Sequence, residues 1–193
     1  MLSRIIKSFV FLLIWAIVLF SVYLFNLFYM KPVSIDHFLG KEIIKDLTSS
    51  PEYMTYLGIF DDLDWLTGHN AKISIPDYED ITEDLNSEKR KLDILTRYSD
   101  KALSPLQQTT KQIAIFDTEN NIQELENFPL HYYPLNQIGG AHLNAIEFLS
   151  DMHQINSYID AKNYIQRASL FDKSFEGLLT ILEKQAEENI YAP

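Results

Sequence analysis

SEKRKLDILTRYSDKALSPLQQTTKQIAIFDTENNIQEL, residues 87–125, predicts two helices joined by almost no linker. Asn86 or Ser87 caps the first helix, because short polar side chains accept hydrogen bonds from the free amides at a helix start. Ser104-Pro105 supplies a cap and a first-turn proline for the second helix. Two helices connected this closely should pack as an antiparallel pair. The apolar residues at helical spacing that we expect to face inward are Leu92, Leu95, Tyr98 and Ala102 on the first helix and Leu106, Ile113, Phe116 and Ile122 on the second.

Similar start and stop signals precede this pair. Ser34 or Asp36 can cap a helix that runs to about residue 47. Ser50-Pro51 repeats the cap-and-proline pattern, and Gly58 suits the end of the short helix that follows. Residues 61–81 are acidic and have few apolar positions in helical phase, so we expect a long surface connection there.

Further helices are predicted after the pair. An irregular segment at 128–144 is followed by short helices at 145–153 and 158–168, the latter after an Asn or Ser cap. The last helix covers about residues 171–189 and carries one continuous apolar stripe. No window shows sustained strand alternation, so the sequence predicts an all-α fold, an irregular α-helical bundle.

The amino terminus carries an apolar segment, FVFLLIWAIVLFSVYLFNLFY, at residues 9–29. About twenty helical residues span the ~30 Å hydrocarbon layer, so this uncharged run is long enough to be a single transmembrane helix. A cleaved signal peptide usually has a shorter apolar core that is followed by an A-x-A cleavage site. This apolar run is longer, and no A-x-A follows it. Arg4 and Lys7 indicate that residues 1–8 form a short cytoplasmic tail. We therefore expect the helical domain, residues 30–193, on the outer side of a bacterial inner membrane.

The charge balance excludes one class of partner. The chain has 27 acidic and 16 basic residues, and residues 31–193 hold all of the acidic ones but only 14 of the basic ones. A domain this acidic repels phosphate backbones, so we expect no nucleic-acid partner. The chain has no cysteine, which excludes disulfide scaffolds, thiolate zinc sites and cysteine nucleophiles.

The sequence has no compact catalytic motif. It contains no H-E-x-x-H, no Gly-rich phosphate loop, no G-x-S-x-G and no EF-hand loop. His142 and Glu147 are five residues apart, whereas two ligands on one helix face need a spacing of three or four. The acidic run at 61–64 lacks the glycine and the closing glutamate of a calcium loop, which favours a solvated loop. We therefore expect no catalytic, cofactor-binding or metal-binding residue in this chain.

The irregular segment at 128–144, FPLHYYPLNQIGGAHLN, is the candidate for lining a cleft. Its prolines remove hydrogen-bond donors, and its Gly-Gly pair permits backbone angles that other residues avoid. Its tyrosines combine a flat apolar body with a polar tip, so they can line a pocket or simply pack the segment onto the bundle. The candidate cleft-lining residues are His131, Tyr132, Tyr133, Asn136, Gln137, Gly139, Gly140, His142 and Asn144.

Two segments carry a resemblance to a known family. FPLHYYPLNQIGGAHLNAIEFL at 128–149 and SPEYMTYLGI at 50–59 are similar to the amino-terminal half of the bacterial family catalogued as domain of unknown function 885. The resemblance implies a predominantly α-helical, exported or membrane-anchored protein that is similar to zinc metallopeptidases of the gluzincin type. The family's zinc motif, His-Glu followed by Pro-Gly-His-His, lies in its carboxy-terminal half. Nothing in this chain matches that motif, so no zinc ligand or catalytic glutamate is carried over.

The resemblance leads to two interpretations of function. In the first, the chain is the non-catalytic amino-terminal part of a zinc-peptidase-like protein, either from an interrupted gene or with a separately encoded catalytic half that holds the zinc. It then forms one wall of a peptide cleft, to which residues 131–144 contribute. In the second, it is a stand-alone anchored helical module that binds peptides or another envelope protein. An independent hydrolase that uses His142 and nearby carboxylates is the weakest alternative.

Overall fold

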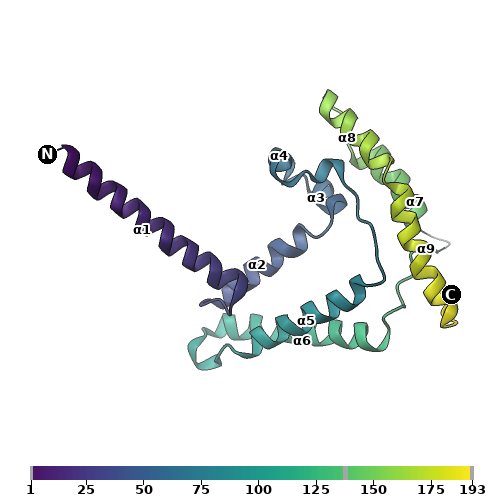
Figure 1. The fold of residues 1–193 in the computed structure, drawn as a ribbon. Helices are drawn as coiled ribbons and strands as arrows, with labels where there is room; N and C mark the ends of the chain where they lie inside the picture. Colours follow the sequence, from purple (N-terminus) through teal and green to yellow (C-terminus); the bar gives the residue numbers. More distant parts are fainter. Residues whose placement is uncertain (1, 137–138, 192–193) are drawn as a thin grey trace.

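The protein is all-α in the part of the chain that the computed structural model describes, residues 2–136 and 139–191 (Figure 1). Within these residues the only β-type pairing is an isolated bridge between Leu135 and Gly140. The predicted fold class is therefore confirmed. The α-helices are α1 (Leu2–Tyr29), α2 (Ile35–Leu47), α3 (Pro51–Leu57), α4 (Asp64–Thr67), α5 (Asp80–Thr96), α6 (Pro105–Asn127), α7 (Ala141–Glu147), α8 (Tyr158–Ala168) and α9 (Phe171–Glu187).

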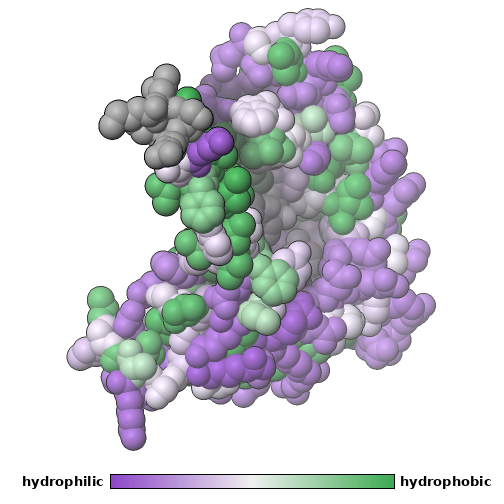
Figure 2. Space-filling view, turned by 60° about the vertical axis from the view of Figure 1, so that its left-hand side comes forward, coloured by the Kyte–Doolittle hydropathy of each residue, from purple (hydrophilic) through white to green (hydrophobic). Residues whose placement is uncertain are grey.

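The first helix stands apart from the others. α1 projects away from the remaining helices in Figure 1, and in Figure 2 apolar residues, drawn in green, gather along it. Among the described residues, Ile6–Tyr29 is the one helical segment long and apolar enough to cross a membrane. Its apolar side chains, such as Phe9, Leu12 and Leu19, are exposed in the protein alone. This segment extends three residues beyond the amino-terminal end of the predicted anchor.

The predicted helical pair forms and carries a cluster of buried apolar residues. α5 and α6 pack side by side, and α2 lies against them. Ile35 and Phe38 of α2 are buried against Leu95 and Tyr98. The Tyr98 hydroxyl donates a hydrogen bond to the carbonyl oxygen of Pro32 at 2.7 Å, which ties the chain before α2 to the pair.

The predicted inward face of α6 is wrong. Leu106, Ile113 and Phe116 are 77%, 64% and 67% exposed. The helix instead buries a face that carries Lys111, whose ammonium donates to the Tyr98 carbonyl oxygen at 2.7 Å and also pairs with an aspartate. The same face carries Ala114 and Ile115, which pack against the apolar cluster, so the buried side of α6 combines a charged side chain with apolar residues other than the predicted ones.

Two further boundaries differ from the prediction. α5 begins at Asp80, before the predicted cap at Asn86 or Ser87, and its first turns carry Ile81 and Leu85, which are four residues apart and both half-buried. The predicted connection at 61–81 contains the 3-10 turns Asp61–Leu63 and His69–Ala71 as well as α4.

The helix caps, in contrast, follow the sequence signals. Ser50 accepts a hydrogen bond from the Tyr53 amide at 3.0 Å, and Gly58 ends α3 at a φ of 65°. Ser104 forms a capping box with Gln107 at the start of α6. The predicted cap-and-proline starts are therefore confirmed.

The remaining helices form a second group. α3 and the His69–Ala71 turn contact α8, and a π-helical turn, Phe148–Met152, continues α7. The extended chain at 72–77 runs against α9, where the Ser174 hydroxyl donates to the Ser74 carbonyl oxygen at 2.9 Å. The helical Gly177 lets the two backbones approach closely, because a Cβ atom there would overlap the Pro76 carbonyl oxygen.

Candidate functional site

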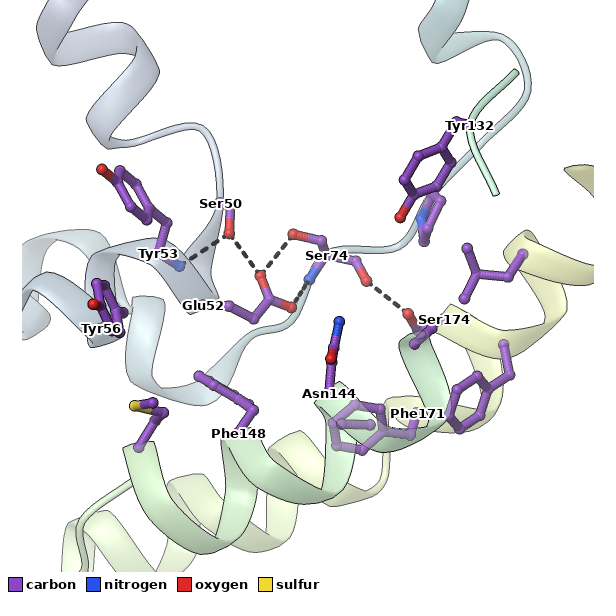
Figure 3. A pocket seen from close by; sticks show the side chains of 16 residues that line it. Ser50, Glu52, Tyr53, Tyr56, Ser74, Tyr132, Asn144, Phe148, Phe171 and Ser174 are labelled. Atoms are coloured by element: carbon purple, nitrogen blue, oxygen red, sulfur yellow. Dashed lines mark hydrogen bonds between the residues drawn. The ribbon is translucent and has the colours of Figure 1, made fainter. Parts of the chain in front are cut away.

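A cavity of about 530 Å³ lies in this second group, between α3, the chain at 74–76, α7 and α9 (Figure 3). Small-molecule pockets typically have volumes of about 300–1,000 Å³, so its size suits a ligand. We call it the aromatic pocket. Its lining residues are Ser50, Glu52, Tyr53, Tyr56, Ser74, Pro76, Tyr132, Ala141, Asn144, Ala145, Phe148, Met152, Phe171, Ser174, Phe175 and Leu178.

Aromatic rings form much of the wall. Tyr53 and Tyr56 stack with their ring centroids 6.4 Å apart, because successive helical turns place them on one side of α3. Phe171 and Phe175 of α9 stack in the same way at 5.9 Å. Figure 3 shows Tyr132 on the opposite side of the pocket from the two α3 tyrosines. Such walls bind flat or apolar groups, and the tyrosine hydroxyls add polar contacts at the edges.

Glu52 is the one charged residue among the described residues that line the pocket. Its Oε1 accepts a hydrogen bond from the Ser74 amide at 2.6 Å. Its Oε2 accepts from the Ser74 hydroxyl at 2.7 Å and from the Ser50 hydroxyl at 2.9 Å, as the dashed lines in Figure 3 show. These contacts tie the chain at residue 74 to the start of α3 and hold the carboxylate in one orientation.

A buried arginine supports the pocket from behind. Arg167 of α8 is 0% exposed, and its guanidinium carbon lies 4.7 Å from the centre of the Phe148 ring. Its Nε donates to the Lys72 carbonyl oxygen at 3.0 Å, and its Nη2 donates to the His69 carbonyl oxygen at 2.8 Å and the Thr55 hydroxyl at 2.5 Å. One side chain thus holds α8 against α3 and the chain at 69–72.

Burial opposes the charge of Arg167. Removal from water lowers the pKa of Arg167 to about 10, against the attraction of Glu52, Asp64 and Asp61, which raises it. The guanidinium remains charged at neutral pH, and three carboxylates surround it at longer range.

Two buried histidines complete this layer. His153 Nδ1 lies 2.6 Å from Arg167 Nη1, and its Nε2 lies 3.0 Å from the Asp160 carbonyl oxygen. Because Arg167 can only donate and a carbonyl can only accept, His153 carries its proton on Nε2. His69 has its Nδ1 2.7 Å from the Thr67 hydroxyl, and its buried Nε2 has no hydrogen-bond partner among the described residues. Both imidazoles therefore belong to the structural layer behind the pocket.

Two of the predicted cleft residues, Tyr132 and Asn144, line the aromatic pocket. His142 lies beside it, in a small apolar groove that it shares with Leu135 and Phe175. His131 packs edge-on against the Phe128 ring, with centroids 5.1 Å apart.

Three other predicted residues, Asn136, Gly139 and Gly140, belong to the turn beside the pocket. The Asn136 side-chain oxygen accepts a hydrogen bond from the Gly139 backbone amide at 2.8 Å. The Asn136 backbone amide donates to the Gly139 carbonyl oxygen at 3.2 Å. Gly140 has a φ of 141°, a region that favours glycine, and it lies close to the backbone at 134–136. Tyr133 is half-buried near the His131 ring. Gln137 lies outside the described residues.

Sequence reasoning missed the residues that give the pocket its charge and its support. Ser50 and Glu52 lie in the segment quoted for the family resemblance, but nothing in their spacing pairs them with Ser74. Arg167 has the sequence position of a surface residue near the end of an amphipathic helix. Only the fold brings it beside acceptors from residues 69 and 72.

The described residues offer no fit for a resident metal ion. Nowhere in residues 2–136 and 139–191 does a group of three or more His, Asp or Glu side chains lie in position to hold one.

Comparison with known proteins identifies one family. The family model described as "Bacterial protein of unknown function (DUF885)" matches residues 51–193, about three quarters of the chain. No curated protein and no solved structure matches this chain. The match includes every residue that lines the aromatic pocket except Ser50, which caps the helix where the match begins. The chain therefore belongs to the DUF885 family of bacterial proteins.

Proposed function

We propose that this chain is a membrane-anchored, non-catalytic helical protein that binds peptide in the aromatic pocket. The pocket then forms one wall of a peptide cleft, and a separately encoded catalytic half of the zinc-peptidase-like type supplies the chemistry. The aromatic pocket carries this proposal, because an apolar cavity with a few fixed polar groups suits a peptide side chain and its backbone.

The contacts of the pocket hydroxyls support a binding role. Ser50 and Ser74 donate to the Glu52 carboxylate, and Ser174 donates to a backbone carbonyl oxygen. A serine nucleophile is usually activated by a general base such as histidine. In the described structure these three hydroxyls stabilise the fold of the pocket, and their hydrogen bonds do not join a histidine.

A second candidate is a stand-alone anchored module that binds a peptide or another envelope protein. The pocket is lined by α3, α7 and α9 of this one chain, together with the chain at 74–76, which favours this alternative. The two candidates share the binding site and differ in whether a catalytic partner is required.

The anchor follows from α1. Residues 9–29 contact the lipid bilayer in this proposal, with residues 1–8 in the cytoplasm and the helical domain outside a bacterial inner membrane. Protease added to spheroplasts should digest the domain, whereas protection of the domain would reverse the proposed orientation.

Peptide binding is tested with the full chain in lipid nanodiscs. Ala145→Trp fills the pocket from α7, and Ala186→Trp adds the same ring at an exposed position of α9. A pool of apolar peptides should bind to the wild type and to Ala186→Trp but not to Ala145→Trp. Equal binding by the two variants would contradict a role for the pocket.

The need for a partner is tested separately. The DNA downstream of this gene should encode a chain with His-Glu and Pro-Gly-His-His, and the two chains together should cleave peptides. If that chain is absent, or if the mixture is inactive, the stand-alone module becomes the better proposal.

A further inference from the structure

We infer that the aromatic pocket selects a ligand with an ammonium group, a peptide amino terminus or a lysine side chain, and binds that group at Glu52. This inference rests on the proposed function, since it names the chemistry that the peptide must bring to the pocket.

The charge of the lining gives the first reason. Glu52 is the one charged residue among the described lining residues, and no cation lines the pocket with it. A carboxylate in a partly dehydrated, aromatic site is strongly attracted to a cation that enters the site and repels a second carboxylate. A ligand that presents an acidic group at this point is therefore disfavoured.

The neighbouring surface has the same sign. A second cavity shares Tyr56 and Met152 with the aromatic pocket. Its lining includes four aspartates, Asp61, Asp64, Asp151 and Asp160. A cationic ligand that approaches the aromatic pocket across this edge is attracted over the whole path, which raises its association rate.

Arg167 does not cancel this field. Its guanidinium is fully buried behind the Phe148 ring, and its donors are engaged by protein acceptors. Three carboxylates, Glu52, Asp64 and Asp61, act on this one cation. The local balance of these groups therefore stays negative.

Glu52 retains the capacity for one more donor. A carboxylate offers about four lone-pair sites, and the three hydrogen bonds from Ser50 and Ser74 leave a site on Oε1. An ammonium group donates up to three hydrogen bonds, and the tyrosine and phenylalanine rings that line the pocket attract cations by their faces. A carboxylate among aromatic rings combines both kinds of attraction.

The test compares two forms of one peptide on the full chain in nanodiscs. The probe is Phe-Ala-Ala-Phe-amide, with a free or an acetylated amino terminus, and the readout is isothermal titration calorimetry. Because hydrogen bonds to charged groups contribute more than neutral ones, acetylation should weaken binding to the wild type about tenfold. An acetylated peptide in which lysine replaces the first phenylalanine distinguishes a side-chain ammonium from an amino terminus.

Glu52→Gln removes the charge with little change in shape. The amide oxygen can still accept from the Ser74 amide, and the serine hydroxyls can rotate to accept from the new NH₂ group. Glu176→Gln is the matched control, because Glu176 is exposed on α9 and does not line the pocket. Glu52→Gln should abolish the difference between the free and acetylated peptides, and Glu176→Gln should preserve it.

The outcomes separate the two proposals. Equal binding of the free and acetylated peptides to the wild type, with binding still lost in Ala145→Trp, overturns the ammonium inference and leaves peptide binding intact. Binding of no peptide to the wild type overturns both. A free-amine preference that survives Glu52→Gln overturns the assignment of the ammonium site to Glu52.

Discussion

Replacing Arg167 with methionine tests whether one buried side chain holds the second group of helices together. The change leaves the Lys72 carbonyl oxygen and the His153 Nδ1 without their charged donor, whereas the His69 carbonyl oxygen keeps the Lys72 amide at 3.0 Å. An unpaired buried acceptor costs about 1–3 kcal/mol, so these two acceptors together cost about 2–6 kcal/mol. Methionine also removes the cost of burying a charge, the cost that lowers the pKa of Arg167 to about 10. We therefore expect a net loss of about 3 kcal/mol in the free energy of unfolding of this group.

Hydrogen exchange on the full chain in nanodiscs measures this loss by segment. If the amides of this group exchange when its helices open, a loss of about 3 kcal/mol corresponds to roughly a hundredfold faster exchange. The increase should appear in α3 and α8, because Arg167 joins them through Thr55 and the chain at 69–72. Exchange in α5 and α6 should stay unchanged, because no hydrogen bond of Arg167 reaches them.

Two variants provide controls. Arg97→Met removes an exposed arginine that pairs with Asp93, and a surface pair of this kind contributes less than about 1 kcal/mol. Arg167→Lys keeps a charge but loses the planar fork, so it should also destabilise α3 and α8. If Arg167→Met changes exchange in α3 and α8 no more than Arg97→Met does, the proposed role of the guanidinium is refuted.

Three further predictions concern a close backbone approach, a helix start and metal content. Gly177→Ala should lower the thermal midpoint, at a cost of about 1–3 kcal/mol in stability, because the new methyl overlaps the Pro76 carbonyl oxygen. Gly40→Ala, with open space around it, should raise the midpoint through a gain of up to about 1 kcal/mol in stability, and equal midpoints would contradict this difference. A hydrogen bond with the Ser157 side chain is the main cause that lowers the pKa of Asp160 below its usual 3.8, so Asp160→Asn should destabilise the protein at neutral pH. That difference should fade as the pH falls below 3.8, and a difference that persists in strong acid would argue against a charge effect. Metal analysis of the full chain should find no stoichiometric zinc, and a peptide assay should detect no cleavage. About one zinc per chain, lost together with activity when a histidine is replaced, would instead reveal a catalytic site.

The helix starts could be predicted from the sequence because their signals are local. A cap residue satisfies amides two or three positions away, so Ser50, Ser104 and Ser157 identify their helices without tertiary information. Gly58 ends α3 for an equally local reason, since its φ of 65° suits a residue without a side chain.

The rotation of α6 could not be predicted because it depends on another helix. Apolar residues occur on several sides of α6, so their spacing alone does not select one face. The buried face carries Lys111, whose ammonium reaches the Tyr98 carbonyl oxygen and Asp100, together with Ala114 and Ile115, which pack against the apolar cluster. Which face of α6 meets α5 therefore depends on contacts that the spacing within α6 does not reveal.

The site was predicted only in part for the same reason. Tyr132 and Asn144 stood out because an irregular, tyrosine-containing segment is unusual in a helical protein. Glu52 and Ser74 are 22 residues apart, and neither has a local signature of its role. Their meeting depends on the path of the chain at 72–77 along α9, which the sequence does not reveal.

The long reach of Arg167 has a consequence for the order in which the chain folds during its synthesis. α5 and α6 are neighbours in sequence, so they can pair as soon as both have left the ribosome. Thr55, in contrast, meets an arginine that is added 112 residues later. Until then α3 lacks the hydrogen bond that joins it to α8, so a nascent chain that stalls before residue 167 leaves the second group of helices incomplete and open to chaperones or to other nascent chains.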